Sequence, residues 1–201
     1  MIRDIALNQG AWLVNNVVDK QRHGGVCHAM TTEWVFDKLQ NRNWVVHESY
    51  WRGVSHQRAY AIYWQDALRG LWGGAHYNQY LQIALRPTEK FISDPARRQG
   101  RDFHVDHVFN LNQLSPHIIG LSAGSGLVIV MFGVDGNDNW GHTVAVVRQA
   151  NDDYLFLDIN QGQYSWAGGT SGGVAGREVE KSLNRLYGND GIRDVYLYRV
   201  G

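Results

Sequence analysis

The sequence predicts an α+β fold in which helices come first and an antiparallel sheet follows. Two observations carry this prediction. Apolar residues recur at helical spacing in the N-terminal half, and several segments beyond residue 125 are rich in Val, Ile, Leu, Tyr and Phe. No internal repeat, low-complexity segment or evident linker interrupts the chain, so we expect a single domain spanning residues 1–201.

Apolar spacing predicts helices at four places in the N-terminal half. The first segment, residues 2–19, is expected to form one or two helical pieces. The second begins at Cys27 and continues to Leu39, after a glycine turn. Two more are expected at residues 55–68 and 75–85, and Pro87 is predicted to end the last of them, since proline lacks the N–H that a helix interior needs.

Strand-like segments dominate the C-terminal half, after a stretch at residues 91–125 that predicts loops with short elements. Hairpin-type turns at residues 135–138 and 151–153 connect the first three strands, which should therefore form an antiparallel meander. A helix at residues 177–187 is expected before the last strand. The predicted strands are residues 127–134, 143–149, 154–159 and 195–200.

Composition excludes several classes of protein. Lys+Arg and Asp+Glu both total 19, so no net charge favours a nucleic acid or an anionic membrane as partner. No apolar run is long enough for a membrane span, and the first ten residues lack the basic and apolar regions of a cleavable signal peptide. The glycine-rich stretch at residues 168–176 lacks the lysine of a phosphate-binding loop, so no cofactor is predicted.

Cys27 is the sole cysteine, which excludes an internal disulfide and leaves its thiol free for chemistry. Thiols attack carbonyl groups as thiolates, and a helix N-terminus beside a histidine favours that form. The amides of the first helical turn can also stabilise a developing oxyanion. The alternative is that Cys27 is a small buried residue that only packs.

His142 and Asp158 are the candidate base and orienting residue. His142 stands at the start of one predicted strand and Asp158 at the end of the next, and the turn between these strands brings both ends side by side. The carboxylate can then bond one ring nitrogen while the other faces the thiol. The alternatives are a strand-edge histidine bonded to backbone and an aspartate that caps a turn before Asn160.

Three further assignments depend on position alone. Gln21, six residues before Cys27, is a candidate oxyanion donor, and His23 is a nearer alternative. Trp140 either shields the His142 pair from water or belongs to the core. A metal site is not predicted, because only two histidines, His104 and His107, show a suggestive spacing, which would place them on one helical face.

Taken together, the motifs resemble the YopT and AvrPphB type of papain-fold cysteine protease. The order Cys, His, Asp and the separations of 115 (142 − 27) and 16 (158 − 142) positions are similar to that family. The matching segments are Gly25-Val26-Cys27 with Met30 and Trp34, Gly141-His142-Thr143-Val144, and Leu157-Asp158-Ile159-Asn160-Gln161-Gly162 with Tyr164.

The resemblance implies a papain-like α+β fold with a helical N-terminal part packed on a C-terminal antiparallel sheet. It also implies a thiol protease with the triad Cys27, His142 and Asp158 and a polypeptide substrate. Members of this family are bacterial effectors or toxin modules involved in virulence. We therefore expect secretion without a cleavable signal peptide and action in the cytosol of a target cell, while the oligomeric state is not indicated.

Two other functions fit the same residues. Cys-His-Asp chemistry also serves amidases of cell-wall peptides, transglutaminases and deamidases. A non-enzymatic interaction module, in which the eight tryptophans face a partner and Cys27 only packs, is the third reading.

Overall fold

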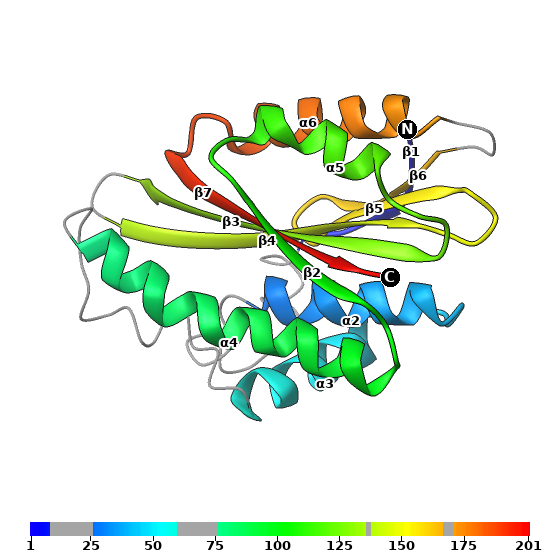
Figure 1. Cartoon of the computed structure of the whole chain (residues 1–201), viewed down its shortest axis with the longest axis horizontal. Coiled ribbons are helices and arrows are strands. Elements are labelled where there is room, and N and C mark those ends of the chain that lie inside the picture. The colour runs from blue at the N-terminus through cyan, green and yellow to red at the C-terminus, as the bar shows by residue number, and fades with distance from the viewer. Residues whose placement is uncertain (9–25, 60–75, 136–137, 167–170) are drawn as a thin grey trace.

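A computed structural model describes residues 1–8, 26–59, 76–135, 138–166 and 171–201. Its centre is a seven-stranded sheet in which every neighbouring pair is antiparallel, with strand order β1-β6-β5-β4-β3-β7-β2 (Figure 1). The strands in chain order are β1 (Ile2–Ala6), β2 (Phe103–Val108), β3 (Ser125–Asp135), β4 (Asp138–Arg148), β5 (Tyr154–Asp158), β6 (Gly162–Ser165) and β7 (Ile192–Val200).

Helices cover both faces of this sheet (Figure 1). Within the described residues, α2, α3 and α4 lie on one face, and α5 and α6 lie side by side on the other. Their bounds are α2 (Cys27–Leu39), α3 (Val46–Ala59), α4 (Tyr77–Arg98), α5 (Leu114–Ile119) and α6 (Gly172–Tyr187), with a short 3-10 turn, η3 (Leu111–Gln113), before α5. None of the described helices is long and apolar enough to cross a membrane.

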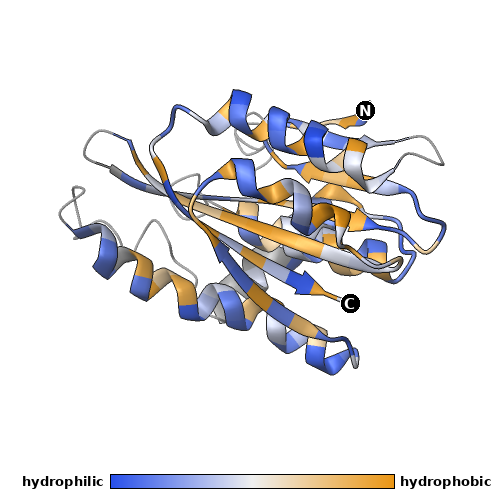
Figure 2. Cartoon of the chain, turned by 45° about the horizontal axis from the view of Figure 1, so that its top comes forward, coloured by the Kyte–Doolittle hydropathy of each residue, from blue (hydrophilic) through white to orange (hydrophobic). Residues whose placement is uncertain are grey.

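The middle of the sheet is buried from both sides, which explains the unbroken apolar run of β3. Val130 and Phe132 pack with α2 and α4, whereas Ile129 and Met131 pack with α5 and α6. A strand covered on both faces loses the alternation of apolar and polar residues that marks a half-exposed strand. Figure 2 shows the consequence, with apolar residues concentrated in the central strands and hydrophilic ones on the outer faces of the helices.

The structure confirms the predicted fold class and several elements. Helix α2 begins and ends at the predicted residues, Cys27 and Leu39. Strands β3, β4 and β5 pair in sequence as an antiparallel meander. The C-terminal helix and last strand are also present, although α6 and β7 each begin a few residues earlier than predicted.

Other predicted elements were wrong. Residues 2–6 form an edge strand rather than a helix, because they pair with β6 and Asp4 accepts a hydrogen bond from Ser165. Helix α4 continues through Pro87 and reaches Arg98, which also replaces part of the predicted loop at residues 91–125. The cost of an interior proline is outweighed here by burial of the helix face that follows it, on which Ile92 and Ala96 are fully covered. The remainder of the predicted helices at residues 2–19 and 55–68 lies largely outside the described residues.

His104 and His107 do not share a helical face, as their spacing suggested. Both lie on β2, where residues three apart point to opposite sides of the sheet. His104 bonds Asp106 at 3.2 Å and His107 bonds Asp194 at 2.7 Å. Among the residues that the structure describes, no cluster of three or more histidine, cysteine or acidic side chains could hold a metal ion.

Candidate active site

Helix α2 places Cys27 at its first residue, against the sheet. The side chain of Cys27 is buried, with 3% of the residue exposed. No side chain caps the helix start and no acidic residue stands in its first turn. The first N–H groups of a helix have no partner within the helix, so the first turn of α2, where Cys27 stands, has backbone donors available.

Strands β4 and β5 bring His142 and Asp158 together by their register. Val144 is paired with Asp158, and His142 lies two residues before Val144 on β4, on the same face of the sheet. The two side chains are therefore diagonal neighbours across the ladder, a separation that long side chains bridge. His142 Nε2 lies 3.0 Å from Asp158 Oδ1, and both residues are buried, with exposed fractions of 6% and 0%.

The end of β5 at Asp158 leaves the first part of β4 without a partner on that side among the described strands. The start of α2 is bonded to this part of β4. His28 and Thr31 both bond Thr143, through its hydroxyl and its carbonyl oxygen, each at 3.2 Å. This contact sets Cys27 beside His142, and a hydrogen bond joins the two side chains. Since Nε2 of His142 already bonds the carboxylate, Nδ1 is the nitrogen left for the sulfur.

Asp158 has two further donors besides His142. The backbone N–H of Asn160 donates to Oδ1 at 2.9 Å, and the hydroxyl of Tyr187 donates to Oδ2 at 2.8 Å. The Tyr187 ring also lies against the imidazole, with ring centroids 5.0 Å apart. Sequence reasoning missed Tyr187, because nothing in the spacing of a residue 29 positions beyond Asp158 at a helix end signals this contact.

Trp140, the aromatic residue singled out from the sequence, has different neighbours. Its indole N–H donates to the carbonyl oxygen of Asp190 at 2.7 Å, and its ring lies over Gly133, where an added Cβ would come within 2.7 Å of it. The aromatic ring that lies against His142 is that of Tyr187. Gln21 and His23, the candidate oxyanion donors, lie outside the described residues.

The contacts in the site shift the pKa values of His142 and Asp158. Burial alone lowers the pKa of His142, but the hydrogen bonds to Asp158 and Cys27 and the electrostatic interactions with these two residues outweigh it and raise this pKa to about 10. Burial alone raises the pKa of Asp158, but the bond and charge of His142, with the donors Asn160 and Tyr187, hold that pKa below its ordinary value. The arrangement therefore favours a protonated imidazolium beside the ionised carboxylate of Asp158.

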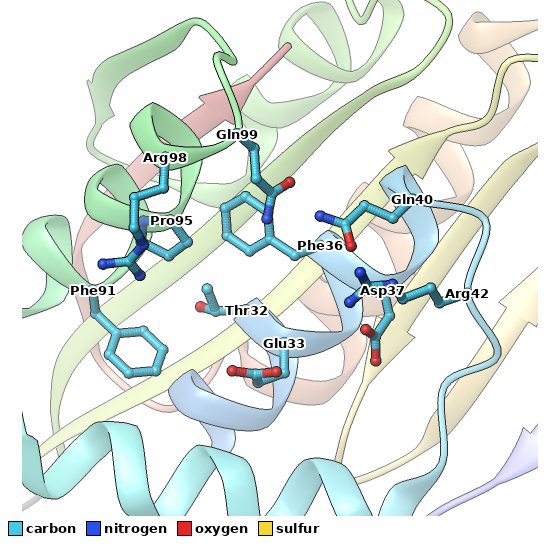
Figure 3. Close-up of a pocket in the computed structure, with 10 residues that line it drawn as sticks. All are labelled: Thr32, Glu33, Phe36, Asp37, Gln40, Arg42, Phe91, Pro95, Arg98 and Gln99. Atoms are coloured by element: carbon cyan, nitrogen blue, oxygen red, sulfur yellow. The ribbon is translucent and has the colours of Figure 1, made fainter.

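A separate pocket lies along the second half of α2, where it faces the second half of α4 (Figure 3). Its volume is about 270 Å³. Phe36, Phe91 and Pro95 form apolar walls, and Arg98 and Glu33 carry charge at its edge. None of Cys27, His142 and Asp158 lines this pocket, so the cysteine, histidine and aspartate constellation is a different place on the molecule.

A helical layer on an antiparallel sheet, with a cysteine at a helix start beside a strand histidine, is the papain-like α+β arrangement. A solved structure shares this fold: the crystal structure of the Pseudomonas avirulence protein AvrPphB aligns with 94% of this chain and 99% of its own, at a TM-score of 0.60 and 19% sequence identity. The structural similarity confirms the AvrPphB-like papain fold predicted from the sequence. No protein-family model matches the chain, and no curated protein is significantly similar to it in sequence.

Proposed function

We propose that this chain is a papain-like cysteine protease in which Cys27 is the nucleophile, His142 the general base and Asp158 the residue that orients the base. The observation that supports it best is the continuous series of contacts from the thiol of Cys27 through the ring of His142 to the buried carboxylate of Asp158. A buried carboxylate needs such partners, and a strand-borne ring held at one nitrogen keeps the other aimed at the thiol.

The reaction follows from these positions. In the reactive state His142 already holds the proton that the Cys27 thiol has given up, and the sulfur, as thiolate, adds to the carbonyl carbon of the substrate amide. The oxyanion that forms can accept hydrogen bonds from the first-turn amides of α2. His142 then gives its proton to the amine, the C–N bond breaks, and a thioester remains. Water, deprotonated by His142, adds to the thioester, and the thiol leaves with the proton.

We further propose a polypeptide substrate and a role as a bacterial effector. Both rest on the structural likeness to a protein described as an avirulence protein and on the sequence motifs around the three residues. Secretion without a cleavable signal peptide and action in the cytosol of a target cell belong to the same proposal. The roughly neutral charge balance gives no reason to assign a nucleic acid as the target.

For this function a substrate must be able to reach the thiol of Cys27. Cys27 and His142 are 3% and 6% exposed, so a polypeptide reaches the sulfur only if the covering atoms move aside. A small alkylating reagent measures access and activation together, without a known substrate. Iodoacetamide at pH 6 reacts slowly with an ordinary thiol, which is almost wholly protonated there.

The test compares the wild type with Cys27→Ala and His142→Ala. We expect iodoacetamide to label the wild type at pH 6, to label His142→Ala much more slowly, and not to label Cys27→Ala. Cleavage of a denatured protein mixture should be lost in both variants while far-ultraviolet circular dichroism stays unchanged. Protein cleavage near the wild-type rate in either variant would refute the triad. Release of ammonia from a glutamine-containing acceptor, or of peptides from cell wall, without protein cleavage would instead favour the related hydrolases.

A further inference from the structure

Tyr187 contacts both the carboxylate and the ring of the proposed triad, although it lies at the far end of a different helix. We propose that Tyr187 is a positioning residue, whose hydroxyl holds the Asp158 carboxylate and whose ring holds the His142 imidazole in the orientation that the thiol requires. This inference rests on the proposed cysteine protease function.

The hydrogen bonds of Asp158 show what the hydroxyl contributes. Oδ1 accepts from His142 and from the Asn160 amide, and Oδ2 accepts from Tyr187 at 2.8 Å. Asp158 is fully buried, so water does not replace a missing donor. A carboxylate held at both oxygens cannot rotate about its χ2 bond, and this fixes the direction of the Oδ1 lone pair that His142 uses.

The neighbours of the Tyr187 hydroxyl determine in which direction it donates its proton. The side chain of Asn160 also bonds this hydroxyl and favours its ionised form, as a donor does. The hydroxyl proton therefore goes to Asp158. Burial, and then the charge of Asp158, raise the pKa of Tyr187 above its ordinary value, so the group stays a donor throughout the working range of pH.

The ring of Tyr187 supplies the second contact. Its centroid is 5.0 Å from that of His142, and the two ring planes are inclined by 37°. Helix α6 carries this ring, since Tyr187 is its last residue. The helix is anchored on the sheet by Val179 and Leu183, both fully buried, and Glu180 accepts from the backbone of Ser115 at 3.0 Å. Helix α6, packed on the sheet, thus contacts the triad from the face of the sheet that α2 does not cover.

Tyr187→Phe is the decisive variant, because it removes the hydroxyl and keeps the ring. The groups that face Tyr187 and titrate are Asp158, His142 and Cys27. Without the hydroxyl, Asp158 takes up a proton more readily, and His142 then loses the anion that holds its charge. The rate of Cys27 alkylation by iodoacetamide is measured as a function of pH. We expect the rise of this rate on the acidic side to move to higher pH by about 0.5 to 1 unit. We expect kcat for protein cleavage to fall about 3- to 10-fold with KM within twofold.

Tyr154→Phe is the matched control, since it removes one hydroxyl from a buried tyrosine on β5, the strand that carries Asp158. Its alkylation profile should overlay that of the wild type. A Tyr187→Phe profile that also overlays the wild type would overturn the inference, and so would a loss of activity without any shift in pH. Two other results would count against the proposed function itself: protein cleavage that persists in Cys27→Ala, or a wild-type Cys27 that iodoacetamide does not label. Tyr187→Leu, which loses ring and hydroxyl, should be impaired further than Tyr187→Phe.

Discussion

Nδ1 of His28 lies 3.2 Å from Oγ1 of Thr143, so the residue after the proposed nucleophile is bonded to the residue after the proposed base. Both side chains are buried. Burial lowers the pKa of His28 to about 3, against the effect of a hydrogen bond with the backbone of Thr88, and the ring is therefore neutral. His28 thus connects α2, which carries Cys27, to β4, which carries His142, and to α4.

We expect Thr143→Val to weaken this connection with little change in volume. Loss of the hydroxyl leaves His28 without its bond to β4, which should cost about 1 to 3 kcal/mol of unfolding free energy. Alkylation of Cys27 should slow as well, because the start of α2 is no longer held against His142. Urea unfolding and iodoacetamide labelling measure the two effects. Thr143→Ser keeps the hydroxyl and is the control; if it behaves like Thr143→Val, the bond is not the cause.

His142 should remain protonated in slightly alkaline solution. Its pKa of about 10 means a charged ring at pH 8, where an ordinary histidine is neutral. Nitrogen chemical shifts of the imidazole report this state directly. In Cys27→Ala and in Asp158→Asn the pKa should be lower than in the wild type, because each change removes a group that raises it. A neutral ring at pH 8 in the wild type would contradict the ion-paired arrangement.

Protonation of His142 also affects stability in a defined range of pH. The folded pKa lies above the ordinary value of 6.5, so the charged ring contributes stability that is fully present below about pH 6.5 and is lost as the pH rises towards about 10. The difference in unfolding free energy between the wild type and His142→Gln should therefore shrink across that interval. A difference that is constant from pH 6 to pH 10 would contradict this linkage.

Gln163 connects the edge strand β1 to the core of the helical layer. Its Oε1 accepts from the buried indole N–H of Trp34 at 2.8 Å, and its Nε2 donates to Asp4 at 3.3 Å. Gln163→Leu should destabilise the protein by about 1 to 3 kcal/mol, since the Trp34 N–H loses its acceptor inside the core. Ser165→Ala, which removes only the exposed bond to Asp4, is the control and should cost less. Equal losses in urea unfolding would show that the indole bond contributes little.

Much of the fold was predictable because its signals are local. The glycine turn and the apolar spacing after Cys27 sufficed for α2, and the meander followed from three apolar segments separated by turn residues. The strand β1 and the full length of α4 were not predictable in this way. Ile2–Ala6 is a strand because β6 pairs with it, and α4 passes through Pro87 because the buried face beyond it outweighs the proline.

From the sequence alone it was clear which groups are available for chemistry: a sole cysteine at a helix start, and a histidine and an aspartate on two adjacent strands. The bonds of Tyr187 to Asp158 and of His28 to Thr143 became visible only once the folded arrangement of the elements was known. Apolar periodicity reports which side of one element faces the core, and so it is readable along the chain. A hydrogen bond between distant segments depends on the register and packing of whole elements, and no local pattern encodes it.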